Sequence, residues 1–217
     1  MSLLLELSNL TSSVVHRNNQ QPCHPNISHY SFSGCATRFL TGRLPLHHGQ
    51  MLSDFTTDDM DLRWNLISQK LSTVGYTSYW FGKGHTGYRS TAHLPTHRGF
   101  RNFTGFLTGE QSYTSNDRWS GDFPFNDTMY SNDLYGSQML TALRNHQDQD
   151  GPFFLYLPWQ AVHLPHTAPP GWPSHDPYRG MLWSTDQYMG QLVQLLKQKG
   201  WWDNTFLVYS ADNGGTQ

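Results

Sequence analysis

Apolar and polar residues alternate along the chain with two distinct periods. Three segments repeat their apolar residues at the three-to-four-residue spacing of a helix; they are residues 58–74, 127–146 and 178–199. Three short runs rich in aromatic and aliphatic residues predict strands at 76–81, 152–159 and 205–210. The last two runs are apolar almost throughout, which is typical of strands buried on both faces.

The order of these segments predicts the fold class. Helices that alternate with apolar strands indicate an α/β protein, with a mostly parallel sheet and helices on both faces. Residues 1–34 are polar and have no sustained period, so we expect an irregular N-terminal segment. Residues 86–126 are expected to form a long surface excursion, and the proline-rich residues 163–178 a rigid loop. Since the sequence stops shortly after the strand at 205–210, we expect an incomplete domain.

Charge and targeting signals exclude several classes of protein. Lys and Arg total 14 against 16 Asp and Glu, which argues against nucleic-acid binding. No apolar run approaches the ~18–20 residues of a membrane span. Four Asn-x-Ser/Thr sequons favour a secreted or lysosomal protein; they start at Asn9, Asn26, Asn102 and Asn126. The first residues lack a basic start and Glu6 interrupts their apolar run, so we do not expect them to be a signal peptide.

Polar side chains gather where the predicted strands end. Lys83 and His85 follow the first strand, His163 follows the second, and Asp212 and Asn213 follow the third. Ligands of such sheets bind at the carboxyl ends of the strands. An ammonium and two imidazoles suit a tetrahedral oxyanion, while the carboxylate and amide suit a hard cation such as Ca²⁺ or Mg²⁺. Each group alone has an ordinary surface or turn explanation, but their occurrence at three consecutive strand ends favours a site.

Several segments resemble motifs of the arylsulfatases, in the same order. Gly-Lys-Gly-His at 82–85 is similar to their Gly-Lys-Trp-His, with Gly84 in place of Trp. Val-His-Leu-Pro at 162–165 and Ser-Ala-Asp-Asn-Gly-Gly at 210–215 resemble their Val-His-x-Pro and Ser-x-Asp-Asn-Gly-Gly. The segments 94–100 and 105–109 look like the N-acetylgalactosamine-4-sulfatase (arylsulfatase B) branch. The resemblance extends over residues 35–217.

The resemblance implies an alkaline-phosphatase-like α/β fold, with residues 35–217 as a partial sulfatase N-terminal catalytic domain. It implies hydrolysis of sulfate esters of small molecules or glycans, assisted by one Ca²⁺. The nucleophile of the family is a cysteine converted to formylglycine by the formylglycine-generating enzyme. Carried over residue by residue, the implied catalytic residues are Cys35, Arg38, Lys83, His85 and His163, and the implied calcium ligands are Asp212 and Asn213.

The sequence departs from the family pattern around the nucleophile. Cys35-Ala-Thr-Arg38 is one residue shorter than Cys-x-Pro-x-Arg, and the alternative Cys23-His-Pro has no Arg after it. No strand that ends in an acidic pair is predicted before Cys35. Asp58 and Asp59 come later, where we expect them to be charges at a helix start. The second active-site Lys of the family falls beyond the last residue, Gln217. We therefore expect weak cation binding and little turnover by this chain.

Two alternatives to hydrolysis of sulfate esters stay open. The first is a non-catalytic sulfatase-like protein that binds sulfated glycans through Lys83, His85 and His163. The second is hydrolysis of phosphate or phosphonate esters on the same fold, although the Val-His-x-Pro pattern favours a sulfatase.

Overall fold

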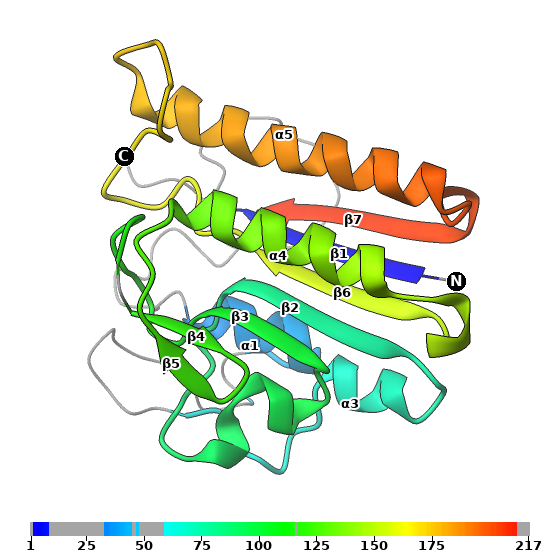
Figure 1. Ribbon diagram of the computed structural model, residues 1–217. Helices are drawn as coiled ribbons and strands as arrows, with labels where there is room; N and C mark the ends of the chain where they lie inside the picture. The colour runs from blue at the N-terminus through cyan, green and yellow to red at the C-terminus, as the bar shows by residue number, and fades with distance from the viewer. Residues whose placement is uncertain (1, 9–32, 45–46, 48–58, 116, 212–217) are drawn as a thin grey trace.

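The computed structural model describes residues 2–8, 33–44, 47, 59–115 and 117–211 (Figure 1). Within these residues one sheet has the strand order β5-β4-β3-β2-β6-β1-β7. The strands are β1 (Ser2–Ser8), β2 (Thr77–Lys83), β3 (Asn102–Phe106), β4 (Arg118–Ser120), β5 (Phe123–Phe125), β6 (Phe153–Pro158) and β7 (Thr205–Ala211). All neighbouring strands from β3 to β7 pair in parallel, and β4 and β5 extend the β3 side as an antiparallel pair.

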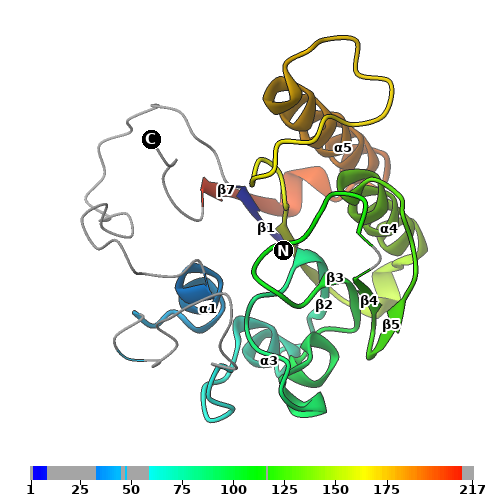
Figure 2. The same ribbon diagram turned by 90° about the vertical axis from the view of Figure 1, so that its left-hand side faces the viewer.

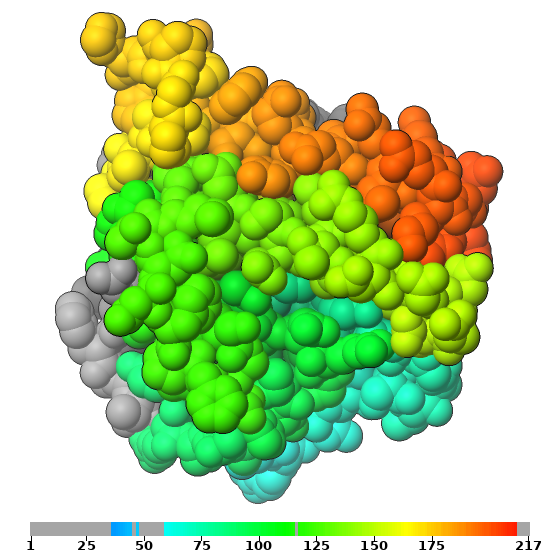
Figure 3. All heavy atoms as spheres, viewed as in Figure 1, coloured from blue at the N-terminus to red at the C-terminus, as the bar shows by residue number. Residues whose placement is uncertain are grey.

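Helices cover both faces of this sheet. They are α1 (Ser33–Thr41), α3 (Ile67–Ser72), α4 (Ser131–Asn145) and α5 (Pro177–Gln198). Four short 3-10 helices occupy Thr91–His93, Pro95–Arg98, Asp148–Asp150 and Trp202–Asn204. α4 and α5 lie side by side over one face, where their side chains form much of the surface (Figures 1 and 3), and α1 and α3 lie on the other. The predicted α/β class, mostly parallel with helices on both faces, is confirmed.

The pattern of β6 explains how one strand joins two cores. Side chains of successive strand residues point to opposite faces. Phe153, Leu155 and Leu157 pack in the core below α4 and α5, whereas Phe154 and Tyr156 pack with residues of α1 and α3. All five side chains are buried. The prediction that this run forms a strand buried on both faces is confirmed, as is the long helix that follows the proline-rich loop.

The N-terminal residues differ from the prediction. We expected irregular structure over residues 1–34, but Ser2–Ser8 form β1 between β6 and β7. The Leu3-Leu4-Leu5 run suits a parallel strand paired on both sides, and the single Glu6 does not prevent it. The rest of the expected irregular segment, residues 9–32, lies outside the described residues.

The helix predicted at 58–74 is much shorter in the structure. It begins only at Ile67, after an extended Leu66. Of the two acidic residues expected at its start, Asp58 lies outside the described residues and Asp59 binds a neighbouring loop. Asp59 accepts hydrogen bonds from the backbone of Tyr88 and Arg89, so the expectation that it caps a helix is wrong.

Two further segments were misjudged from their composition. The expected surface excursion at 86–126 contains β3, in which Phe103 and Phe106 are buried. Gly105 in this strand is required by packing, because a Cβ there would lie 1.8 Å from the carbonyl oxygen of Gly82. In contrast, β7 is less buried than its apolar sequence predicted, and Phe206 is 57% exposed.

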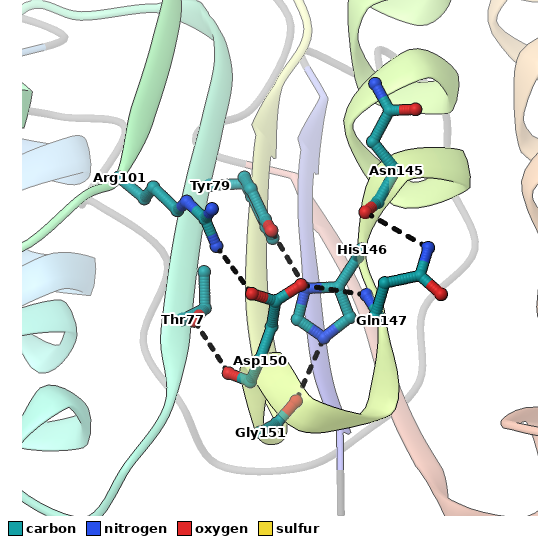
Figure 4. A network of polar contacts seen from close by, with 8 residues as sticks. All are labelled: Thr77, Tyr79, Arg101, Asn145, His146, Gln147, Asp150 and Gly151. Atoms are coloured by element: carbon teal, nitrogen blue, oxygen red, sulfur yellow. Dashed lines mark hydrogen bonds and ion pairs between the residues drawn. The ribbon is translucent and has the colours of Figure 1, made fainter.

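A closed polar network joins the amino ends of β2 and β6 (Figure 4). The hydroxyl of Tyr79 donates to Nδ1 of His146 at 2.8 Å, and Nε2 of His146 donates to the carbonyl oxygen of Gly151 at 2.9 Å. Nearby, Arg101 pairs with Asp150 at 3.1 Å. In this amino-edge cluster (Tyr79, Arg101, His146, Asp150 and Gly151), Tyr79 and Gly151 satisfy both ring nitrogens of the buried His146.

Among the described residues, no helix is long and apolar enough to cross a membrane.

Candidate active site

The carboxyl ends of β2 and β6 lie next to each other because these strands pair in parallel, with Trp80 opposite Tyr156. Figure 2 looks onto this edge of the sheet. Lys83 is the last residue of β2, His85 follows two residues later, and His163 lies in the loop after β6. These three residues are called the carboxyl-edge cluster below.

The backbone around Lys83 is held by the neighbouring strand. Gly84 donates to the carbonyl oxygen of Phe106 at 2.7 Å, and His85 donates to that of Leu107 at 3.1 Å. The indole of Trp80 donates to the carbonyl oxygen of Lys83 at 3.1 Å. Lys83 itself is only 6% exposed, so its ammonium lies in a protected position where its charge acts strongly on a neighbouring anion.

His85 is strained and neutral. Its φ of 53° lies in the left-handed region, which is uncommon for a residue with a side chain. Burial, followed by the charges of Lys83 and His163, lowers the pKa of His85 to about 3. Its buried Nδ1 has no hydrogen-bond partner among the described residues. The charges of Lys83 and His163 therefore both act on His85, as expected for side chains at one edge.

His163 is oriented by its own loop. Its Nδ1 lies 2.6 Å from the carbonyl oxygen of Leu164, which can only accept, so Nδ1 carries a proton. The backbone N–H of His163 donates to the carbonyl oxygen of Gln160 at 2.9 Å. The loop contains two cis peptide bonds, Ala161–Val162 and Leu164–Pro165. Because Nδ1 is bonded to Leu164, Nε2 is the nitrogen that can exchange a proton with a ligand.

Asp59 supports the loop that follows His85, and the sequence did not reveal this role. One carboxylate oxygen accepts from the backbone of Tyr88 at 2.6 Å and of Arg89 at 3.0 Å, and the other pairs with the Arg89 side chain at 3.1 Å. Gly87 has φ +100°, and a Cβ there would lie 2.3 Å from the same carboxylate. The run Thr-Gly-Tyr directly after His85 was the available signal for such a tight turn.

The other candidate residues are placed only in part. Cys35 is the third residue of α1, and Arg38 follows one turn later. Asp212 and Asn213 come directly after β7 and lie outside the described residues. Within the described part of the chain, no three His, Cys, Asp or Glu side chains gather into a group that could hold a metal ion.

A cavity of about 530 Å³ lies away from the carboxyl-edge cluster, between the end of α1 and the start of α3. Arg43, Trp64 and Lys70 contribute to its lining, and the guanidinium of Arg43 stacks 3.8 Å above the centre of the Trp64 ring. Neither Lys83 nor either histidine of the carboxyl-edge cluster lines it. The chemistry of the site therefore does not lie in this cavity.

Comparison with known proteins connects the chain with sulfatases. The family model described as Sulfatase matches residues 33–216. Mouse arylsulfatase J is 31% identical over 205 residues, covering 82% of this chain and 34% of the relative. Human N-acetylgalactosamine-6-sulfatase is 27% identical over 207 residues, covering 81% and 39%. The chain thus spans about a third of the length of these curated relatives.

Solved structures agree in fold. The PsFucS1 sulfatase from Pseudoalteromonas sp. superposes with a TM-score of 0.77 at 20% identity, covering 98% of this chain and 55% of that one. Ps i-CgsB, solved in complex with k-i-k-neocarrahexaose, superposes with a TM-score of 0.77 at 25% identity, covering 99% and 59%. The relatives do not single out the arylsulfatase B branch, which stays a prediction. Because the Sulfatase family model matches most of its length, the chain belongs to the sulfatase family.

Proposed function

We propose that this chain supplies the sulfate-binding part of a sulfuric ester hydrolase. The observation that carries the proposal is the carboxyl-edge cluster, in which a buried ammonium and two imidazoles act on one another at the ends of adjacent parallel strands. Sulfate-ester cleavage needs positive charge near the sulfate oxygens and a proton for the leaving oxygen. This cluster can supply both.

Each member of the cluster has a distinct proposed role. The ammonium of Lys83 neutralises the sulfate oxygens, and its burial strengthens that interaction. His85 is neutral at pH 7 because its pKa is about 3, so it offers a hydrogen bond without adding a third charge. When the His163 ring carries a second proton, at Nε2 as well as at the Nδ1 bonded to Leu164, Nε2 gives that proton to the alcohol oxygen as the bond between sulfur and that oxygen breaks. Arg38 is proposed to bind the sulfate from α1.

Cys35 and the calcium ligands complete the proposal. Sulfatases in general depend on a formylglycine and a metal ion. Cys35 lies in the first turn of α1, where the unpaired backbone N–H groups favour negative charge, so its place fits a nucleophile. Its hydrated aldehyde would supply the attacking oxygen. Asp212 and Asn213 would offer two of the oxygen ligands that Ca²⁺ needs, and a bound cation would withdraw charge from the sulfate.

The partners follow from this chemistry. We propose sulfated small molecules or glycans as substrates, the formylglycine-generating enzyme as the modifying partner of Cys35, and a secreted or lysosomal location in keeping with the four sequons. The non-catalytic alternative is less favoured, because the curated relatives named here are enzymes.

Mass spectrometry of the Cys35 peptide and a turnover assay together test the proposal. The chain is expressed with the formylglycine-generating enzyme, and a chromogenic aryl sulfate and aryl phosphate are offered with added Ca²⁺. Conversion of Cys35 together with selective binding of sulfate supports a sulfatase, and the little turnover expected of this chain should favour the sulfate ester, disappear in Cys35→Ala and survive in Cys23→Ala. Binding of sulfate without any conversion favours a glycan-binding protein. Failure to bind sulfate at all contradicts both.

A further inference from the structure

The buried hydroxyl of Tyr113 binds the loop that carries His163. Tyr113, which is fully buried, shares its one hydroxyl proton between the carbonyl oxygen of Gln160 at 3.0 Å and that of His163 at 2.9 Å. The same Gln160 oxygen accepts the backbone N–H of His163. One hydroxyl therefore fixes both backbone ends of His163, its N–H through Gln160 and its carbonyl directly.

Tyr113 is itself anchored more firmly than an ordinary loop residue. Its carbonyl oxygen accepts from the backbone N–H of Ser131 at 2.8 Å, from the Ser131 hydroxyl at 3.1 Å and from the guanidinium of Arg118 at 3.1 Å. Arg118 and Ser131 are fully buried. Because Ser131 begins α4, the position of Tyr113 is tied to a helix that packs on the sheet.

A second set of bonds holds Gln160 to the same support. The Ser131 hydroxyl donates to its side-chain oxygen at 2.7 Å, and its side-chain nitrogen donates to the carbonyl oxygen of Gln111. Buried polar networks whose members are all bonded are rigid, and they hold a neighbouring group in one geometry. The ring of His163, fixed in turn by its bond to Leu164, inherits that geometry.

We propose that Tyr113 is the positioning residue of His163: it sets the place of the ring at the carboxyl edge of the sheet and, through the loop, the bond of Nδ1 to Leu164 that fixes its tautomer. The inference rests on the proposed function, in which the ring passes a proton to the leaving oxygen. Such a transfer needs heavy atoms within about 2.6–3.2 Å of each other, so a small movement of the loop removes it. The hydroxyl of Tyr113 bonds to the backbone of this loop, so Tyr113 acts on the reaction through His163.

The neighbouring Tyr130 provides a matched control. Its ring stacks on that of Tyr113 with centroids 5.4 Å apart, it is also buried, and its hydroxyl also donates to a carbonyl of this loop, that of Thr167, at 2.9 Å. Tyr113→Phe and Tyr130→Phe each remove one buried hydroxyl from the same small core. Only the first removes a bond to His163.

The test compares the two variants in the whole chain by ¹⁵N NMR of the His163 ring and by titration with inorganic sulfate at constant ionic strength. In Tyr113→Phe we expect ring nitrogen shifts that indicate mixed tautomers and a dissociation constant for sulfate about fivefold higher or more. Tyr130→Phe is expected to match the unaltered chain in both, while the melting temperature falls similarly in both variants. Equal ring shifts and equal sulfate affinity in the two variants would overturn the inference.

Two further outcomes are separable. If Tyr113→Phe does not fold, Ser131→Ala replaces it, because this change removes one bond to Tyr113 and one to Gln160. The ring signals of His163 should then shift in the same direction. Unchanged ring signals would overturn the positioning role. If sulfate perturbs neither His85 nor His163 in the unaltered chain, the proposed function fails. The ring signals measured without sulfate still decide the role of Tyr113.

Discussion

The two ends of β2 and β6 each carry a buried histidine cluster, and the clusters differ in what their ring nitrogens contact. At the amino edge, His146 uses both nitrogens in hydrogen bonds at 2.8 and 2.9 Å, and its ring packs against Phe153 and Trp201. At the carboxyl edge, Nδ1 of His85 is buried with no hydrogen bond among the described residues, and its backbone is left-handed.

This difference separates a stabilising cluster from one that we propose to bind a ligand. A buried polar group without a partner costs free energy, and so does a strained backbone. Proteins retain such costs mainly where a ligand recovers them, and strongly shifted pKa values gather at such places. At the amino edge, in contrast, both ring nitrogens of His146 already have partners. Changes at the two edges should therefore have opposite effects on stability and on sulfate affinity.

The largest expected effect is on sulfate binding in Lys83→Met. Removal of one partner of a buried charge interaction weakens binding by about 2–5 kcal/mol, or roughly thirtyfold and more. The pKa of His85 should rise at the same time, because the charge of Lys83 is one cause of its depression. Calorimetric titration with sulfate and NMR titration of His85 measure both. Lys70→Met, in α3, is the control and should bind sulfate normally. Unchanged affinity in Lys83→Met would remove Lys83 from the site.

His146→Leu should show the reverse pattern. It removes two hydrogen bonds and the edge contacts of the ring with Tyr79, Phe153 and Trp201, so we expect the free energy of unfolding to fall by about 3 kcal/mol. Urea denaturation gives this value, and sulfate titration of the folded variant should give the affinity of the unaltered chain. A loss of sulfate affinity larger than the loss of stability would mean that the two edges are coupled.

The sequence predicted the carboxyl-edge cluster better than it predicted the segments that support it. Lys83, His85 and His163 were found because they follow apolar strands, and the rule for parallel sheets then placed them at one edge. Their supports depend on contacts between residues far apart in sequence. Asp59 binds backbone amides about thirty positions away, and neither residue type nor spacing indicates such a bond.

The errors in the fold have a similar cause. β3 contains Gly105, which usually suggests a loop, but here the glycine allows close approach to Gly82 of β2. β1 was missed because a single short apolar run is weak evidence until its two neighbours in the sheet are known. The strand β6 and the helix α5 were predicted well, because their patterns are strong over their whole length.

His85 should also make the stability of the chain depend on pH. Its pKa is about 3 when folded, against an ordinary value near 6.5, so between these values the unfolded chain binds a proton that the folded chain does not. Stability contributed by the neutral ring is therefore present above about pH 6.5 and is lost as the pH falls towards 3, by a few kcal/mol at most.

Urea denaturation at several pH values should give a flatter profile of unfolding free energy against pH for His85→Gln. Bound sulfate should reduce the loss, since an anion favours the protonated ring. A profile that is identical in the variant would show that His85 is not the group responsible.

The smallest expected effect concerns Gly84, which stands where the arylsulfatase motif has Trp. A Cβ at Gly84 would lie 2.7 Å from the carbonyl oxygen of Phe106 and 3.1 Å from the Cα of Leu107, so both β3 and its extension would have to move. We expect Gly84→Ala to cost about 2 kcal/mol, a value within the range for overpacked positions. Gly190→Ala is the matched control. Apart from its chain neighbours and the backbone of its own helix, no atom of the described residues lies within 4 Å of a Cβ there, and in the helix α5 the change should stabilise by up to about 1 kcal/mol. Thermal melts of the two variants measure the difference. The contrary result is a Gly84→Ala variant that is as stable as the unaltered chain and binds sulfate equally. The backbone of the carboxyl-edge cluster would then be less tightly fixed than its hydrogen bonds to β3 indicate, and the contrast with the amino edge would weaken.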